Sequence, residues 1–263
     1  MIDTHAHITD NQYNVTERTQ IINNFDCDGL QYVVNMGCDV LDSIDSVNLA
    51  HEHDKIYSAV GVHPENVDSW NDDTIVELAR LAQDPKVVAI GEIGLDYHYT
   101  KENADKQKEI FIAQLRLAHE CHLPVVLHNR DSIGDMLQIL ENNADLLVDG
   151  GVLHCFSESV EVYKRVQKLG LKVGFGGVCT FKNARKTVEV IEQIDLNDFV
   201  VETDSPYLTP EPYRGKCKNQ PKYVRYIIEK IAQIRNLSVE QVEKMSTTNA
   251  LDLYKKIGAK WMK

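Results

Sequence analysis

Seven ionisable residues follow or end short apolar stretches of this sequence. They are His5 and His7 in MIDTHAHI, His63 after AVGV, Glu92 after VVAIG, His128 after PVVL, His154 after GGVL and Asp204 in FVVETD. Side chains two residues apart on a strand point to the same side, so the imidazoles of His5 and His7 converge. Burying several imidazoles and two carboxylates side by side is costly unless a cation compensates them. The pattern therefore predicts a site for one or two divalent metal ions.

The chemistry expected of such a site is hydrolysis. Mixed imidazole and carboxylate ligands suit Zn²⁺, Mn²⁺, Fe²⁺ or Mg²⁺, and ligand type alone excludes none of them. If Glu92 bridges two ions, each ion can act as a Lewis acid, and a water shared between them loses its proton near neutral pH and becomes the nucleophile. Of the histidines outside this pattern, we expect His51, His53, His119 and His122 to be structural or solvated. His98 follows Glu92 by six residues and either borders the pocket or lies at the surface.

The elements that must position these residues are eight strand-like runs separated by helix-like segments. The runs cover residues 1–8, 30–37, 56–63, 87–94, 123–129, 150–157, 171–177 and 198–208. Apolar residues recur at three- and four-residue intervals in the segments 16–25, 41–54, 72–83, 104–122, 159–170, 184–194, 222–236 and 238–258. Consecutive apolar positions in the runs are typical of parallel strands that are buried on both faces. We predict an α/β fold, a (β/α)8 TIM barrel formed as one domain by residues 1–263, rather than an open doubly wound sheet.

In such a barrel the functional face is at the C-terminal ends of the strands, where the seven ionisable residues fall. The formal net charge of −12 would repel polyanions unless bound cations or a local basic patch reverse the field. No run approaches the roughly 18 apolar residues of a membrane span, and no leader segment is evident, so we expect a cytoplasmic protein. The six cysteines form no CxxC pair and are expected to be reduced thiols.

Seven sequence blocks give the chain a family resemblance. The blocks are DTHAH, GVHP, GEIGLDY, LHNRDS, LHCFS, GFGGVCTFKNA and ETDSPYLTPEPYRGK, in this order. From Ile2 to about residue 221 the chain resembles the TatD family of metal-dependent deoxyribonucleases, whose fold is the amidohydrolase-like barrel. The resemblance implies two divalent ions, typically Mg²⁺ with Mn²⁺ or Zn²⁺ as alternatives, and a DNA substrate.

The resemblance also implies a role for each site residue. One ion would be held by His5, His7 and Asp204, the other by His128 and His154, with Glu92 bridging both. Asp204 would orient the attacking water or accept its proton, and Glu202 could orient a ligand from behind it. His63 and Arg130 would contact phosphate or another part of the substrate, although a loop salt bridge would equally explain Arg130.

The chain departs from the family pattern at the rim of the expected site. Glu158 stands where relatives often have glycine, Asn129 and Ser132 occupy variable places, and RGKCKNQP is one residue longer than usual. If Glu158 faces the mouth of the pocket, it would oppose a phosphate backbone and favour single strands or ends; a charged residue at the start of the next helix is the simpler interpretation. A basic cluster follows the eighth run and could guide nucleic acid or be merely solvated: Arg214, Lys216, Lys218 and Lys222.

Three functions remain open from the sequence. The first is a deoxyribonuclease that cleaves phosphodiester bonds, from an end of the DNA, with metal-activated water. The second is an amidohydrolase-type enzyme acting on a small ester, lactone or amide, because one barrel can host several chemistries. The third is a catalytically inactive binding protein, against which the complete set of six predicted ligands argues.

Overall fold

The chain forms a single eight-stranded parallel sheet in which each strand pairs with the next along the sequence. The computed structural model describes residues 1–258. The strands are β1 (Ile2–Ala6), β2 (Tyr32–Met36), β3 (Ile56–Val60), β4 (Val87–Asp96), β5 (Val125–Arg130), β6 (Gly151–Leu153), β7 (Lys172–Phe175) and β8 (Phe199–Val201). Just beyond β8 the chain returns to β1: Asp204 N donates to His5 O at 2.9 Å, and His7 N donates to Ser205 O at 2.7 Å. These bonds close the sheet into the predicted barrel.

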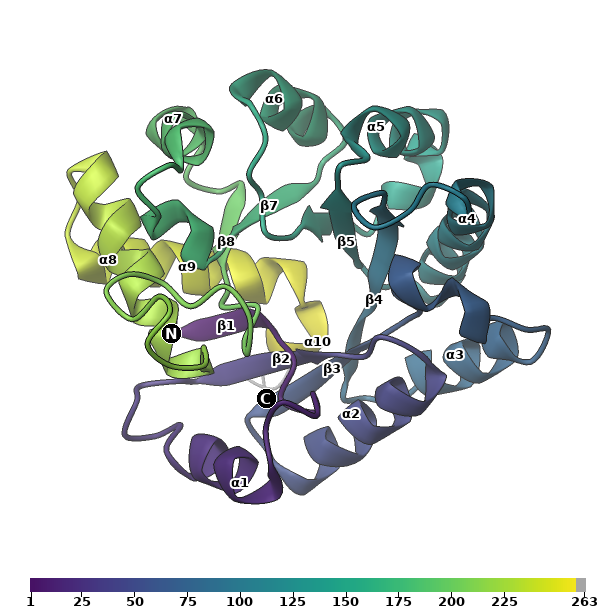
Figure 1. The fold of residues 1–263 in the computed structure, drawn as a ribbon, viewed down its shortest axis with the longest axis horizontal. Helices are drawn as coiled ribbons and strands as arrows, with labels where there is room; N and C mark the ends of the chain where they lie inside the picture. Colours follow the sequence, from purple (N-terminus) through teal and green to yellow (C-terminus); the bar gives the residue numbers. More distant parts are fainter. Residues whose placement is uncertain (259–263) are drawn as a thin grey trace.

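Helices surround the strands in the described part of the chain (Figure 1). They are α1 (Val15–Asn23), α2 (Val40–Glu52), α3 (Thr74–Ala82), α4 (Ala104–Cys121), α5 (Ile133–Asn142), α6 (Val160–Lys168), α7 (Arg185–Gln193), α8 (Val224–Arg235), α9 (Val239–Leu253) and α10 (Lys255–Gly258). Short 3-10 turns also occur, namely η1 (Pro64–Ser69), η2 (Ala144–Leu147), η3 (Gly177–Thr180) and η4 (Pro221–Tyr223).

The eight strand predictions are confirmed, and one helix prediction needs correction. α5 follows the fifth strand, where we gave no helix boundaries, and its buried Met136, Leu137 and Leu140 have helical spacing. The segment 238–258 was expected to be one helix. It is divided at Tyr254, whose φ of −98° and ψ of 67° are not helical, so that α10 turns away from α9.

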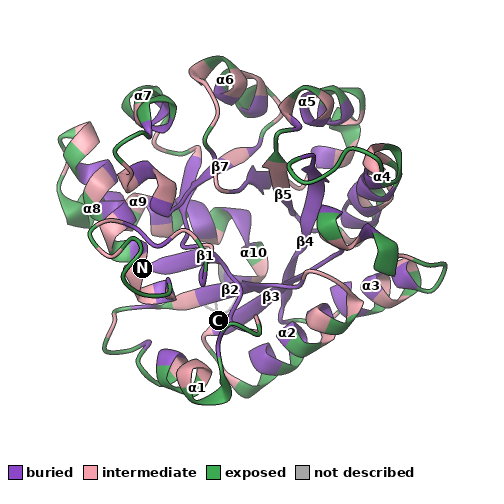
Figure 2. Ribbon diagram, in the orientation of Figure 1, coloured by how far each residue is buried: buried purple, intermediate pink, exposed green. Residues whose placement is uncertain are grey.

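The core has two parts because each strand is buried on both faces (Figure 2). One part packs the strands against the surrounding helices and includes Phe111, Leu115 and Val190. The other joins strand residues such as Val126 and Val200 to residues of the C-terminal helices. None of the described helices is long and apolar enough to cross a lipid bilayer.

The C-terminal helices close one end of the barrel. Leu253, Tyr254 and Ile257 pack against strand residues in the inner core. The hydroxyl of Tyr254 donates to Thr4 O at 3.3 Å, and Lys256 Nζ donates to Asp84 O at 3.2 Å in the turn before β4. These contacts place α9 and α10 at the N-terminal ends of the strands, which leaves the opposite end for the predicted site.

Candidate metal centre

The predicted site residues meet at the C-terminal ends of the strands because of the two-residue period of a strand. On three strands an apolar residue of the inner core is followed, two positions later, by an ionisable residue of the site. The pairs are Val126 and His128 on and near β5, Val152 and His154 on and after β6, and Val200 and Glu202 on and after β8. The same alternation therefore supplies an apolar layer and then a polar layer.

Glu92, on β4, lies at the centre of the cluster and is 3% exposed. Its Oε1 lies 2.7 Å from His128 Nδ1 and 2.7 Å from His154 Nε2. Its Oε2 faces the other two imidazoles, at 3.3 Å from His5 Nε2 and 3.5 Å from His7 Nε2. The two oxygens of the Glu92 carboxylate thus face different pairs of histidines, as those of a bridging ligand would.

Asp204 completes the side of the cluster formed by β1. Its Oδ1 lies 3.3 Å from His7 Nε2 and 3.6 Å from His5 Nε2, and the two Nε2 atoms are only 3.2 Å apart. The residue has a φ of 54°, so the backbone turns sharply where β8 passes into the loop that contacts β1. His5, His7 and Asp204 each offer a ligand atom within 4.8 Å of the others, and so do His5, Glu92 and His154.

The donor set fits a divalent cation. Two ring nitrogens that face each other at 3.2 Å and also face one carboxylate oxygen cannot all be satisfied by the protons of neutral imidazoles. A cation among them would accept every lone pair at once. Burial alone would raise the pKa of Glu92, but the nearby His154 and His5 hold it well below its usual range, so the carboxylate stays charged. Burial and the neighbouring His154 lower the pKa of His5, which leaves its ring neutral and able to coordinate.

His63, predicted as a substrate contact, lies inside the cluster. Its Nε2 is 3.7 Å from Glu92 Oε1, and its ring centroid is 4.3 Å from that of His128. Burial, followed by the nearby His128, lowers the pKa of His63 to about 3, so the ring is neutral. Because Nδ1 accepts a hydrogen bond from Glu65 N, the ring proton must be on Nε2. His63 therefore presents an N–H donor to the centre of the site.

Arg130 does not join the cluster. It is exposed at the end of β5, and its guanidinium lies over the ring of Tyr99, 5.2 Å from the centroid. Tyr99 is itself 74% exposed. Arg130 and Tyr99 are therefore accessible to a ligand at the rim of the site. The contact of Arg130 with substrate remains a prediction, and this geometry permits it.

Asp96 is a site residue that we did not predict from the sequence. Its Oδ2 lies 2.9 Å from His128 Nε2, on the opposite side of the ring from Glu92. Burial would raise the pKa of Asp96, but the hydrogen bond to His128 lowers it overall, so this carboxylate too is charged. The signal was present: Asp96 follows Glu92 by four residues on β4, a spacing that returns to the same face of a strand.

The rim residues that depart from the family pattern contact one another. Asn129 Nδ2 donates to Glu158 Oε1 at 3.3 Å, and Ser132 Oγ donates to Asn129 Oδ1 at 2.9 Å. Glu158 precedes the N-cap Ser159 of α6, so it is not the first residue of that helix. Behind the site, Glu202 Oε1 lies 3.6 Å from His154 Nδ1, where the predicted orienting partner was expected.

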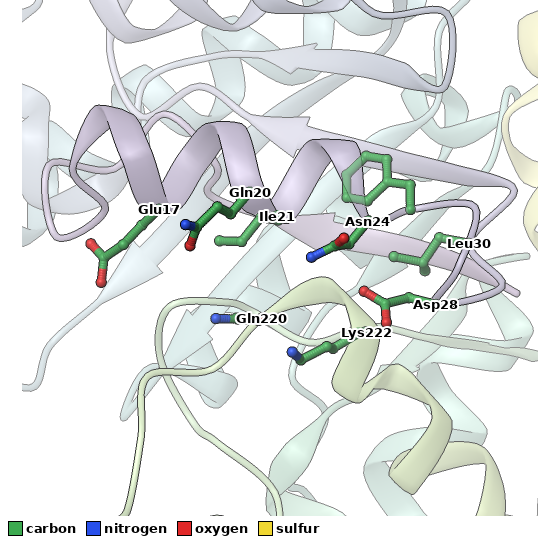
Figure 3. A pocket seen from close by; sticks show the side chains of 9 residues that line it. Glu17, Gln20, Ile21, Asn24, Asp28, Leu30, Gln220 and Lys222 are labelled. Carbon is green, nitrogen blue, oxygen red and sulfur yellow. The ribbon is translucent and has the colours of Figure 1, made fainter.

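The other candidate residues lie elsewhere. His51 pairs with Asp84 at 2.8 Å and is exposed, and His122 ends α4 on the surface. Of the basic cluster, Lys218 is paired with Glu17 at 2.8 Å. A cavity of about 130 Å³ lies between α1 and the segment before α8, and none of the seven strand-end residues lines it. Figure 3 shows residues of its lining, among them Glu17, Gln20, Asn24, Gln220 and Lys222.

Comparison with known proteins places this architecture among nucleases and metal-dependent hydrolases. The family described as TatD related DNase matches residues 2–255. An uncharacterised metal-dependent hydrolase of Bacillus subtilis, YabD, is 38% identical over 97% of this chain and 99% of its own. The 3′-5′ ssDNA/RNA exonuclease TatD of Escherichia fergusonii is 31% identical over 97% of this chain and 98% of its own. The crystal structure of YJJV, a TatD homologue from Escherichia coli, superposes with a TM-score of 0.90 at 26% identity, covering 97% of this chain and 98% of that one.

Proposed function

We propose that this chain, which belongs to the TatD-related DNase family, is a metal-dependent hydrolase that cleaves phosphodiester bonds at an end of single-stranded DNA. The observation that carries the proposal is the position of Glu92, whose two oxygens face two separate histidine pairs at 2.7–3.5 Å. A carboxylate placed in this way suits a centre that holds two divalent cations.

We assign the ligands as the family resemblance implies, and the distances around Glu92 support this assignment. His5, His7 and Asp204 would hold one cation, His128 and His154 the other, and Glu92 would bridge them. Mg²⁺ is the proposed physiological ion, with Mn²⁺ or Zn²⁺ as alternatives. Cations bound there would supply Lewis acidity toward a phosphodiester and acidify water.

Three side chains have the protonation needed to assist. Burial would raise the pKa of Asp204, but the hydrogen bond from His7 and the neighbouring histidines lower it overall, so the group is a carboxylate that can orient water and accept its proton. The Nε2–H of neutral His63 can donate to a phosphate oxygen. Arg130 at the rim can contact the next phosphate along the strand.

The proposed substrate class rests on family membership and on the rim. A relative that shares 31% identity is named an exonuclease of single-stranded DNA and RNA, which supports a single-stranded end as the substrate. The exposed Tyr99 and Arg130 offer a stacking surface and a cation to an unpaired nucleotide. Cytoplasmic location remains part of the proposal, and the finding that all six cysteines are free thiols supports a reducing compartment.

The test is cleavage of end-labelled single-stranded DNA by metal-stripped protein to which Mg²⁺, Mn²⁺ or Zn²⁺ is returned. Wild type should shorten the strand only with metal, and Glu92→Ala and Asp204→Ala should abolish shortening. Labels at the 3′ and 5′ ends report polarity, while a blunt duplex and an RNA of the same sequence report substrate preference. Melting temperatures of the variants check that they are folded.

The same proteins distinguish the alternatives. Cleavage that persists in both variants would place the chemistry outside the cluster. Absence of cleavage with every metal, together with turnover of a small ester, lactone or amide, would favour the amidohydrolase-type reaction. Absence of turnover of any of these substrates would favour a binding protein.

A further inference from the structure

Cys38 places a thiol beside the candidate metal centre, in a position outside the six assigned ligands. The residue follows β2 by two positions, and its Sγ lies 3.6 Å from His7 Nδ1. His7, Cys38 and Glu92 each offer a ligand atom within 4.8 Å of the others. His7 thus has a donor on each side of its ring: Nε2 faces Asp204 and Glu92, whereas Nδ1 faces the sulfur.

Hydrogen bonds hold the backbone of Cys38 in place. Cys38 N donates to Asp42 Oδ2 at 2.9 Å. Cys38 O accepts from His63 N at 2.9 Å and from Asn66 Nδ2 at 3.0 Å. These three bonds fix the Cα position of Cys38, and the contact with His7 Nδ1 at 3.6 Å orients its side chain. Preorganised donors of this kind are what a metal site requires.

The separation of sulfur and nitrogen matches two ligands of one tetrahedral ion. Zinc–sulfur and zinc–nitrogen bonds of about 2.3 and 2.1 Å at a tetrahedral angle put the two ligand atoms about 3.6 Å apart. The observed Sγ–Nδ1 distance is 3.6 Å. Thiolates select soft ions, whereas Mg²⁺ requires an octahedral, oxygen-rich shell. The thiol therefore discriminates between classes of ion that the histidines and carboxylates alone would accept.

We propose that Cys38 is a thiolate ligand that, with His7 and Glu92, gives thiophilic divalent ions a binding site at the edge of the metal centre. The proposal rests on the proposed function, since it shares two of the assigned ligands with it. On binding, the Cys38 thiol gives its proton to solvent and the sulfur forms a bond to the ion; no electron is transferred. His7 would coordinate through Nδ1 as a neutral imidazole with its proton on Nε2, so this ion would bind in place of the cation assigned to Nε2. Ions such as Zn²⁺ and Cd²⁺ can then bind with a donor that Mg²⁺ does not use.

The first test is the ultraviolet charge-transfer absorption that forms when a thiolate binds Cd²⁺. Metal-stripped wild type titrated with Cd²⁺ should develop this band by the first equivalent. Cys38→Ser should lack the band at that equivalent, and Cys27→Ser, which removes an exposed thiol from the loop after α1, should retain it. A band of full intensity in Cys38→Ser, or no band in wild type, would overturn the proposal.

A second test needs no variant. Peptide mapping after brief maleimide treatment of the wild-type protein reports the alkylation rate of Cys38. Cd²⁺ should slow that rate by ~10-fold or more because the bound sulfur is no longer nucleophilic, while Mg²⁺ should change it by less than about twofold. Equal rates with and without Cd²⁺ would refute the thiolate ligand.

Neither readout depends on turnover, so the two proposals can fail separately. A protein that binds Cd²⁺ through Cys38 but cleaves no DNA with Mg²⁺ would contradict the proposed function alone. One that cleaves DNA yet forms no Cys38–Cd²⁺ band would contradict only the role of the thiol.

Discussion

The same strands line both ends of the barrel interior, but their side chains are apolar at one end and ionisable at the other. At the N-terminal end, inward-packed valines contact Leu253, Tyr254 and Ile257 of the C-terminal helices. Two residues further along, the same strands present histidine or glutamate. One end therefore contributes burial of apolar surface, and the other gathers charges whose burial opposes folding.

This difference explains how the fold stays stable although its site buries ionisable groups. Buried ionisable groups such as Glu92 and His154 are costly without a cation, so stability must come from elsewhere. At the opposite end of the barrel, α9 and α10 remove large apolar side chains from water, and Tyr254 is fully buried there. Substitutions at the two ends should consequently have separable effects, on unfolding at one end and on metal binding at the other.

The largest expected effect is that of Tyr254→Ala, between α9 and α10 at the N-terminal end of the barrel. Removing this buried ring should lower the free energy of unfolding by about 3–5 kcal/mol, as for other large-to-small aromatic substitutions. Urea denaturation measures the loss. Tyr254→Phe is the matched control, since it keeps the ring and removes only the hydrogen bond to Thr4, for roughly 1 kcal/mol. A decline in Mn²⁺ affinity of the folded protein as large as the decline in stability would contradict the separation of the two ends.

The reverse result is expected for His154→Ala at the opposite end. This variant loses an imidazole 2.7 Å from Glu92, so Mn²⁺ affinity measured by calorimetry should fall by more than ~100-fold, beyond the effect of losing an outer partner. The metal-free protein should unfold at nearly the same urea concentration as wild type. Val152→Ala, two residues earlier on the same strand, should do the opposite by lowering stability and sparing the affinity. Equal losses of affinity in both variants would contradict the comparison.

Asp96→Asn tests the support behind one ligand. The carboxylate of Asp96 holds His128 Nε2 at 2.9 Å and so directs Nδ1 toward Glu92. Replacing it with a neutral amide should lower Mn²⁺ affinity by about 10–100-fold with little change in unfolding. Asp131→Asn removes a carboxylate that pairs with the exposed His98 near the same end and should leave the affinity unchanged. If both variants bind Mn²⁺ as wild type does, the contact with His128 does not position the ligand.

A smaller effect is expected at the rim from Arg130→Ala. Loss of one exposed cation beside Tyr99 should raise the KM for single-stranded DNA by about 3–10-fold and weaken its dependence on salt, with kcat nearly unchanged. Steady-state kinetics at several salt concentrations measures both quantities. Arg116→Ala on the exposed face of α4 is the control. An equal change in KM for both variants would mean that Arg130 acts only through net charge.

The sequence predicted the elements and the central residues because both depend on short-range periodicity. Alternation along single strands sufficed to bring His5 and His7 together, and the end of each apolar run located Glu92, His128 and His154. The (β/α)8 order then placed those ends in one region, as the structure and the family comparison confirm. The grouping of these residues into two cation sites came from the resemblance and remains a proposal.

Features that depend on pairs of distant segments were not predictable in the same way. Asp96 meets His128 because β4 extends along β5 as far as Arg130, and a register shift separates Ile90 from Ile93. Cys38 lies in the turn after β2, where a lone thiol in a sequence is ordinarily interpreted as a small buried apolar residue. The break at Tyr254 reflects tertiary packing against the barrel, which overrides the continuous helical pattern of the segment.

The smallest predicted effect concerns acid stability at the N-terminal end, where Asp84 ties the turn before β4 to its neighbours. Burial would raise the pKa of Asp84, but hydrogen bonds from His51 and from Lys86 N lower it overall. A carboxyl whose folded pKa lies below its unfolded value of about 3.9 stabilises the protein above that pH and loses the contribution as pH falls through the folded pKa. Asp84→Asn should therefore be less stable than wild type at pH 6 by under about 1 kcal/mol, and the gap should close toward pH 3. Urea denaturation between these pH values follows the gap, with Asp72→Asn on the exposed loop before α3 as the control. A gap that stays constant with pH would assign the effect to packing of the loop rather than to the charge of Asp84.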